Sequence, residues 1–550
     1  MPLGIGNSVG RLRAMDGREG RLSRQTFLQG ALVLMIAGIV TRIMGFIYRI
    51  VLTRLIGAEA MGLFQIVFPI LGLALTFVTM GFPLAIAKLV AEAVAKRDVD
   101  RVRRVMRISS ACVLTSAALC MGVMYAFRHV VAQYWLTDPR AYPTYLAMIP
   151  VVGVIAVASL YRGYFQGIQD MTPTAWASIL EQSVRIISIW ALAAYFVRFS
   201  LAYAAMAAMV GMVLGELSGL LFLIWQQRRR ARMDQVVPEP AYARTSEPMR
   251  ATLRAITQLS LPVTASRLIW SLLSATEPIL VLRALGMAGV PLKQATALYG
   301  AYSGMAIPLL VFPTVVTSSL ATNLVPAVAE AQASGNVERI RHRLSQSITV
   351  TAMVSFPASI VFTFFAAPLT RAIYGDAHVG PMLAIMAPFV FMLCLQSPLT
   401  GILQGLNRAG TAMVNSIVGG VARLAVILVL ATRPSLGILG VSIATAFSFT
   451  LTAALHLIAV VREIGFQMRT TSVVRIGVAS AAMLAYMLLI TFRAGSSLSG
   501  SALLLALVGG LMLYFALLCS LRVLTSRAVE RVPKVGPWLA AVVRHLPFAI

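Results

Sequence analysis

The chain has 550 residues, of which 59% are hydrophobic and only 12% are charged, and its mean hydropathy is +0.84. This composition excludes a water-soluble globular protein and indicates an integral membrane protein, because a soluble core could not absorb so much apolar sequence. The formal net charge is +27, which raises the question of nucleic-acid binding; the position of the charges answers it below.

Apolar runs of roughly twenty residues, the length of a membrane-spanning helix, recur along the chain. They predict an all-α integral membrane protein with about 14 transmembrane helices, at 27–55, 61–87, 108–131, 141–162, 176–198, 201–227, 257–285, 297–323, 346–373, 379–405, 411–432, 437–461, 473–492 and 501–521.

Two short patterns recur at the same spacing of 238 residues. Gln-Gly-Ile-Gln at 166–169 returns as Gln-Gly-Leu-Asn at 404–407, and Val-Asp-Arg-Val-Arg at 99–103 returns as Val-Glu-Arg-Ile-Arg at 337–341. A constant offset over separate motifs indicates internal duplication, which is typical of transporters whose halves rock about a shared site. Since six helices per repeat is an even number, we expect parallel repeats related by a pseudo-twofold axis along the membrane normal.

This duplication predicts two six-helix lobes followed by two extra helices. The expected parts are a cytoplasmic basic tail (1–26), an N-lobe of helices 1 to 6 (27–228), a cytoplasmic linker (229–255), a C-lobe of helices 7 to 12 (256–466), helices 13 and 14 (467–523) and a cytoplasmic tail (524–550).

The basic residues are distributed unevenly over this topology. With the amino terminus inside, about 32 of the 46 Lys and Arg residues lie in the tails and inward loops, and about nine lie in outward loops. This is the positive-inside pattern, so we expect both termini in the cytoplasm and contacts with anionic lipids, with no nucleic-acid partner.

Residues 88–107 combine valines with basic residues and predict an amphipathic helix on the inner membrane surface, or else a solvated loop.

Ionisable side chains within a span are costly and are functional candidates by default. Arg42 and Arg49 lie two turns apart on one face of helix 1, and Arg54 lies near its outer end. The first two either bind substrate or form a buried structural pair. Arginine suits a lipid-linked diphosphate, because its rigid fork binds phosphate oxygens bidentately and keeps its charge.

Helix 5 and its repeat carry a second set of charges. Glu181 and Arg185 have the i, i+4 spacing of an ion pair. Arg423 is the counterpart of Arg185, but Gly419 replaces the glutamate, so we expect Arg423 to lack a local partner and to be the better candidate for facing the cavity.

Three further buried charges complete the set. In helix 7, Arg267 is a substrate-site candidate, and Glu277 either binds a coupling cation or pairs with an arginine of the other lobe. Glu216 lies among small residues and favours a packing role. The deep groups are five arginines and three glutamates, so the cavity should prefer anions.

The sequence contains no Walker loop, HExxH motif, nucleophile elbow or Cys/His cluster. We therefore expect no catalytic residue, metal or cofactor, and an enzyme is disfavoured. Coupling to the membrane potential or to a monovalent cation remains open.

Several stretches resemble the stage V sporulation protein B group of polysaccharide-biosynthesis membrane proteins. They are residues 23–30, 41–46, 54–63 and 81–88 together with the Gln-Gly repeats, so the resemblance covers nearly the whole chain. That group belongs to the multidrug, oligosaccharidyl-lipid and polysaccharide exporter superfamily, which includes the lipid II flippases. The resemblance implies a V-shaped fourteen-helix flippase of a bacterial cell membrane, with a cationic cavity between lobes and helices 13 and 14 lining a groove for the lipid tail.

The chain departs from lipid II flippases in helices 1 and 2. It is similar to them at Arg42 and Arg54, but the second helix-1 arginine comes one residue later, at Arg49. Their helix-2 arginines have no counterpart here, so recognition of the diphosphate is expected to rely more on helix 7, through Arg267.

Our hypothesis is a flippase that moves a prenyl-diphosphate-linked saccharide, such as a lipid II-like peptidoglycan precursor or a polysaccharide unit, from the inner to the outer leaflet for cell-wall or spore-cortex synthesis. Partners would be that lipid, anionic membrane lipids and cell-wall synthesis proteins. Two alternatives are a cation-coupled multidrug antiporter of the same superfamily and a non-transporting membrane scaffold for cell-wall synthases.

Overall fold

The computed structural model describes residues 27–96, 98–234, 249–465, 470–494 and 500–524, and within these ranges it contains helices and no strand. This confirms the predicted all-α membrane fold. The expected tail 1–26, residues 235–248 of the expected linker and residues 525–550 of the expected C-terminal tail lie outside the described residues.

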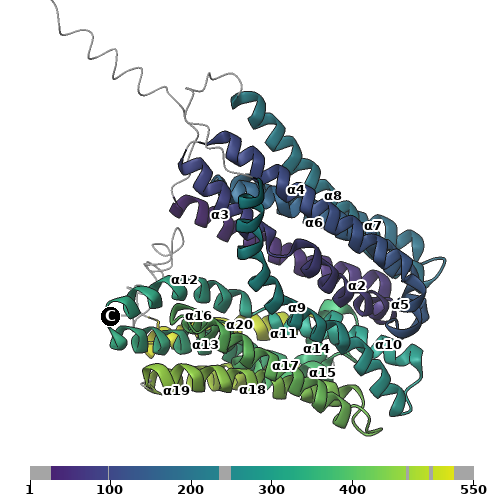
Figure 1. The fold of residues 1–550 in the computed structure, drawn as a ribbon. Helices are drawn as coiled ribbons and strands as arrows, with labels where there is room; N and C mark the ends of the chain where they lie inside the picture. The colour runs from purple at the N-terminus through teal and green to yellow at the C-terminus, as the bar shows by residue number, and fades with distance from the viewer. Residues whose placement is uncertain (1–26, 97, 235–248, 466–469, 495–499, 525–550) are drawn as a thin grey trace, which may run out of the picture.

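The first half of the chain forms one bundle of helices (Figure 1). Its elements are α2 (Phe27–Thr79), α3 (Phe82–Ala95), α4 (Val99–Ala126), α5 (Arg128–Tyr134), the short η1 (Pro139–Ala141), α6 (Tyr142–Gly167), α7 (Thr172–Phe196) and α8 (Leu201–Asp234).

The second half begins with the long helix α9, which passes from the first bundle to a second one (Figure 1). Its elements are α9 (Met249–Met287), α10 (Leu292–Gly300), the π-helical η2 (Ala301–Ala306), α11 (Ile307–Val311), α12 (Thr314–Ala333), α13 (Val337–Phe364), α14 (Ala366–Tyr374), α15 (Gly380–Met386), η3 (Ala387–Phe389), α16 (Val390–Gly405), α17 (Ala409–Leu430) and α18 (Ile438–Ile464), followed by α19 (Thr470–Ala494) and α20 (Gly500–Ser520).

The two bundles meet at the end that holds α5 and α10 and diverge toward the end that holds the α3–α4 and α12–α13 turns (Figure 1). The largest buried apolar cluster includes residues from both bundles, such as Leu52 and Val281. Burial of this shared core holds the halves together at the closed end.

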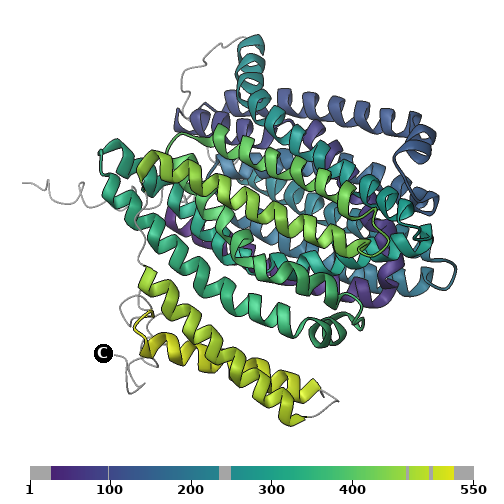
Figure 2. The ribbon, with the colours of Figure 1, turned by 90° about the horizontal axis from the view of Figure 1, so that it is seen from below.

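Helices α19 and α20 lie to one side of the bundles (Figure 2). They pack on α13 through a separate apolar cluster that includes Ala352, Met483 and Leu518. The Tyr514 hydroxyl donates to the Met353 carbonyl at 2.8 Å, which satisfies a polar group that would be costly in a membrane.

Eleven helices among the described residues are long and apolar enough to cross a membrane, or twelve with the bent pair Leu292–Val311 and Thr314–Ala333. Ile36–Ala95 is one of these eleven, although two spans were expected there, and α7 is not among them. The count of fourteen therefore stays a prediction.

Helix α2 contains the first expected span (27–55) and most of the second (61–87). Its backbone leaves the helical conformation at Gly57 (φ 73°, ψ 176°), where the chain turns back. Glycine adopts positive φ without steric cost, so the turn needs no loop. A second glycine, Gly81 (φ 69°), separates α2 from α3, and Pro83 then lies in the first turn of α3.

The expected amphipathic helix over 88–107 is wrong. The structure has a helix–turn–helix there, because α3 ends at Ala95 and Asp98 caps α4 by accepting a hydrogen bond from the Arg101 N–H at 2.8 Å. Asn336 caps α13 in the same way, accepting from the Arg339 N–H at 2.9 Å. The two caps are 238 residues apart.

Close helix contacts recur at the same offset. A Cβ on Gly167 would lie 2.6 Å from the Val90 Cβ, and one on Gly405 would lie 2.7 Å from the Val328 Cβ. Each glycine therefore lets two helices approach closely. The two glycines are 238 positions apart in the sequence, and so are the two valines. The turns that follow match as well, since Gln169 (φ 60°) and Asn407 (φ 59°) are both left-handed.

Residues near the closed end contact their own counterparts. A Cβ on Gly300 would overlap Gly62, and the Gln65 amide donates to the Ser303 carbonyl at 2.9 Å. Gly62 and Gly300 differ by 238, as do Gln65 and Ser303. A pair of counterparts can touch only beside the axis that relates them, so these contacts fit the expected pseudo-twofold arrangement. The lobe boundaries themselves stay predictions.

Replacing Gly167 or Gly405 with leucine should destabilise the protein by about 1–3 kcal/mol, because each side chain would overlap a packed valine. The measurement is thermal unfolding in detergent. Gly72→Leu is the control, since nothing lies within 4 Å of a Cβ there. Equal melting temperatures for all three variants would contradict the repeated packing.

Candidate functional site

A cavity of about 540 Å³ lies between the two bundles. The first bundle contributes residues of α2, α7 and α8, and the second contributes residues of η2, α11 and α12. The lining residues are Arg42, Gly45, Phe46, Tyr48, Arg49, Leu52, Met61, Phe64, Phe68, Gln182, Arg185, Met212, Ser303, Ile307, Pro308, Val311, Phe312, Thr314, Val315 and Ser318.

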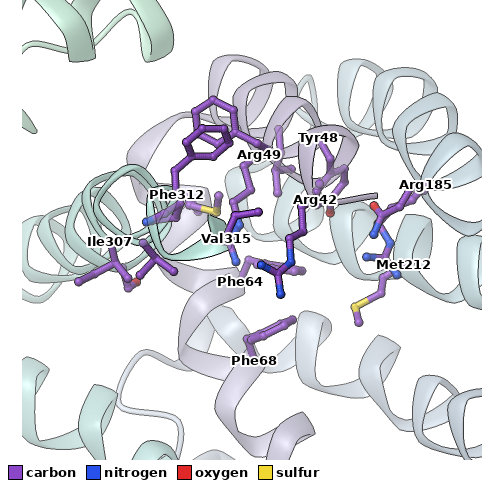
Figure 3. Close-up of a pocket in the computed structure, with 18 of the residues that line it drawn as sticks. Arg42, Tyr48, Arg49, Phe64, Phe68, Arg185, Met212, Ile307, Phe312 and Val315 are labelled. Atoms are coloured by element: carbon purple, nitrogen blue, oxygen red, sulfur yellow. The ribbon is translucent and has the colours of Figure 1, made fainter. Parts of the chain in front are cut away.

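Three arginines and no carboxylate are among these lining residues. Figure 3 shows Arg42 and Arg49 extending from α2 and Arg185 from the neighbouring helix, with Ile307 and Phe312 of the other bundle nearby. The cavity is therefore cationic on the wall of the first bundle and neutral on the wall of the second. Such a site favours an anion.

Arg42 and Arg49 face the cavity as helix periodicity predicts, and they are not buried together as an isolated pair. The Arg42 Nη1 donates to the Ser318 Oγ at 3.0 Å, which links the two walls. Phe46 and Phe312 also meet across the walls, with ring centroids 5.2 Å apart. Within the described part of the chain, Arg49 has no carboxylate partner, so its charge is available to a ligand.

The third arginine, Arg185, is held by the first bundle. Its Nη2 donates to the Glu216 Oε1 at 2.7 Å, and its guanidinium lies 5.8 Å from the centre of the Tyr48 ring. The expected Glu181–Arg185 pair is wrong: Glu181 accepts instead from Arg162 of α6. Arg162 was not singled out from the sequence, because it lies at the end of an expected span.

The expected packing role of Glu216 is consistent with its neighbours but incomplete. A Cβ on Gly215 would lie 2.8 Å from the Glu181 carbonyl oxygen, so this glycine does allow α8 to approach α7. Glu216 itself binds Arg185, and its Oε2 lies 3.7 Å from Arg162.

Arg423 is not without a partner, and it does not line the cavity. It donates to Glu277 of α9, which belongs to the same half of the chain rather than to the other lobe. A Cβ on Gly419 would meet the Thr452 hydroxyl, so a second helix fills the place of the missing glutamate. The expected ranking of Arg423 above Arg185 is therefore reversed.

The remaining candidates lie away from the cavity lining. Arg54 donates to the carbonyls of Ala372 and Ile373, with 2.7 Å to the latter, and so joins α2 to α14. Arg267 is exposed on α9 and is not among the lining residues. The structure therefore gives no support to recognition through helix 7.

A polar cluster near the closed end was missed from the sequence. Asp138 is fully buried; its Oδ2 accepts from the Thr296 Oγ1 at 2.8 Å and from the Arg140 Nη2 at 2.7 Å, and Arg140 also donates to Glu59. Burial by itself would raise the pKa of Asp138, but hydrogen bonds from Arg140 and Thr296 outweigh it and lower the pKa. The charged form therefore joins η1 to α10 at neutral pH.

Comparison with known proteins shows which family this chain belongs to. The polysaccharide biosynthesis protein family model matches residues 27–332, more than half of the chain, and the MatE family model matches residues 300–429. Stage V sporulation protein B of Bacillus subtilis (strain 168) is 34% identical over 524 residues, which cover 94% of this chain and 99% of that protein. Lipid II flippase MurJ of the same organism is 24% identical over 420 residues, covering 72% and 76%.

A solved structure, lipid II flippase MurJ in an inward closed conformation, shares the fold with a TM-score of 0.66 at 12% identity, over 88% of this chain and 98% of that one. These family matches and relatives define a multi-pass membrane transporter of the exporter superfamily named above rather than an enzyme. The chain belongs to the polysaccharide biosynthesis protein family, as its sequence resemblance indicated.

Thr296→Val should loosen the closed end, because it removes the hydroxyl that joins α10 to Asp138 with little change in shape. A hydrogen bond to a carboxylate contributes about 1.5 kcal/mol, so we expect roughly tenfold faster labelling of a cysteine placed at Ser303 by an impermeant maleimide added outside. The four native cysteines are replaced first.

Thr317→Val is the matched control, since the Thr317 hydroxyl bonds only within its own helix, to the Thr314 carbonyl at 3.3 Å. Unchanged labelling in the Thr296 variant would show that this hydrogen bond does not hold the end closed.

Proposed function

We propose that this transporter is a flippase for a prenyl-diphosphate-linked saccharide, such as a peptidoglycan precursor or a polysaccharide unit. The observation that carries the proposal is the cavity between the bundles, whose lining includes three arginines and no carboxylate. A diphosphate diester carries two negative charges and accepts several hydrogen bonds, which the forks of Arg42 and Arg49 can donate.

The other lining residues fit the rest of such a headgroup. Ser303, Thr314 and Ser318 offer hydroxyl groups on the opposite wall, and Phe64 and Phe68 form a pair of aromatic rings 5.8 Å apart. Aromatic faces and scattered hydroxyls are surfaces against which a sugar can pack and hydrogen-bond. The volume, about 540 Å³, lies in the usual range for small-molecule sites.

In the proposed cycle the headgroup enters at the diverging end of the bundles. In this proposal that end and both termini face the cytoplasm, because the basic residues favour that orientation. The diphosphate displaces Ser318 from Arg42 and binds Arg42 and Arg49. The diverging ends then close and the closed end parts, so that the headgroup reaches the outer leaflet, while the prenyl tail stays in lipid beside α19 and α20. Cell-wall synthesis proteins would supply or consume the lipid.

The membrane potential can drive this cycle without a cofactor. Moving an anion outward is favoured by an inside-negative potential, by about 2.3 kcal/mol per charge per 100 mV if the full field is crossed. A monovalent coupling cation remains an additional proposal.

A cation-coupled multidrug antiporter is the second candidate, because the MatE family model matches residues 300–429. Three cavity arginines would repel a cationic drug. Saturable efflux of cationic dyes by the purified protein would favour this candidate.

Arg42→Ala and Arg49→Ala should each reduce transport of a fluorescent lipid-linked disaccharide in proteoliposomes by at least roughly a hundredfold, because each removes a charged bidentate donor worth about 3 kcal/mol. Arg42→Lys should retain part of the activity, since lysine keeps the charge but loses the fork.

The matched control is Arg433→Ala, which removes an exposed arginine from the turn after α17, outside the cavity lining. Normal transport by both alanine variants would rule out this substrate site. Transport equally weakened by Arg433→Ala would mean that total charge matters rather than the cavity.

A further inference from the structure

Two buried glutamates and two partly exposed arginines form a charged cluster behind the cavity wall. They come from three helices: Arg162 of α6, Glu181 and Arg185 of α7, and Glu216 of α8. Glu181 and Glu216 are 6% and 7% exposed. Arg162 donates to Glu181 and lies 3.7 Å from Glu216, and Arg185 donates to Glu216 at 2.7 Å. Two positive and two negative charges balance in this arrangement.

The cluster is balanced in charge but not in hydrogen bonds. Among the described residues, the Glu216 Oε2, the Nε atoms of Arg162 and Arg185, and the hydroxyl of Tyr48 are buried without a hydrogen-bond partner. Unpaired buried polar atoms are costly, and three of these four belong to the charged cluster itself. Such a site can change its protonation or its partners at low cost.

Arg185 belongs to this cluster and to the cavity at the same time. It lines the cavity beside Arg42 and Arg49, and its only carboxylate partner among the described residues is Glu216. An anion that binds Arg185 from the cavity therefore competes with Glu216 for one guanidinium.

When the anion replaces Glu216 as the partner of Arg185, the cluster keeps two negative charges but only one positive charge to neutralise them. Once Arg185 is engaged by the anion, Arg162 alone must neutralise both Glu181 and Glu216. A buried carboxylate without a compensating charge takes up a proton rather than remain ionised. The proton comes from water and forms an O–H bond on a glutamate, while both arginines keep their charge.

We propose that Glu181 and Glu216 together form a proton site that is linked to the anion site of the cavity. Binding of an anion at Arg185 and binding of one proton by this carboxylate pair favour each other, and by reciprocity a fall in pH tightens anion binding. The inference deepens the proposed function and rests on it, since the anion is the substrate diphosphate.

The groups that face Glu216 from the packed helices are Arg162 of α6, Glu181 and Arg185 of α7, and, through Arg185, Tyr48 of α2. Lowering the pH protonates a carboxylate of the pair and releases Arg185 to the cavity. Raising the pH restores the Arg185–Glu216 bond and weakens anion binding.

The second half of the chain offers a matched pair that lacks this link. Arg423, 238 residues after Arg185, binds Glu277, but neither residue lines the cavity. A single carboxylate faces a single arginine there, so anion binding in the cavity does not disturb the pair.

The experiment is calorimetric titration of the full-length protein in lipid nanodiscs with P1,P2-dimethyl diphosphate, between about pH 8 and about pH 5.5. This diester keeps two negative charges over that range, so any pH dependence comes from the protein. Repeating the titration in buffers of different ionisation enthalpy counts the protons taken up.

We expect wild-type affinity to rise as the pH falls, by up to tenfold per pH unit, with uptake of up to one proton per anion. Glu216→Gln should bind tightly at all pH values with no proton uptake, because Arg185 is then always free. Glu181→Gln should also lose the proton uptake, because Arg162 can then neutralise Glu216; it serves as the test if Glu216→Gln does not fold.

Glu277→Gln should behave as wild type. Wild-type binding that is weakened by Arg42→Ala but takes up no proton would overturn the proton site and leave the proposed function standing. Proton uptake that survives in both Glu216→Gln and Glu181→Gln would also overturn it. No binding of the diphosphate at any pH would overturn the anion site and the proton site together.

Discussion

An arginine within a membrane must be neutralised by a carboxylate or reached by water, and the structure depends on how each arginine meets this demand. Arg423 and Glu277 satisfy each other within the second half of the chain. Arg162 and Arg185 share two glutamates within the first half. Arg42 and Arg49 have no carboxylate among the described residues and lie where the bundles part. The proposed substrate site is therefore the place where two arginines have no carboxylate partner among the described residues.

The duplication makes this asymmetry visible. The two halves keep the same helix caps, the same glycine contacts and an arginine at the same position of the fifth helix. The cationic positions of the first helix are not kept: the residues 238 positions after Arg42 and Arg49 are Leu280 and Met287. One half therefore carries the charge of the cavity, and the lining residues of the other half are neutral.

Much of the fold could be predicted from the sequence. The length of a span is visible in a single apolar segment, and the constant offset is visible when two segments of the sequence are compared. The orientation of Arg42 and Arg49 also followed from helical periodicity alone. The ion-pair partners could not be obtained in this way. Glu181 prefers Arg162 over Arg185, and Arg423 finds Glu277, because such choices depend on which helices pack together. The turn at Asp98, in contrast, could have been predicted from the sequence, since an aspartate directly before a helical stretch is a preferred N-cap residue.

Counterpart residues touch near one end of the molecule, where Gly62 meets Gly300 and Gln65 meets Ser303. Two bundles joined there can rotate relative to each other about a point close to one end of the molecule. A given rotation moves atoms little beside these contacts and most at the opposite end, which holds the α3–α4 and α12–α13 turns (Figure 1). While these contacts hold, a small rotation of one half therefore changes mainly the width of the opening at the diverging end.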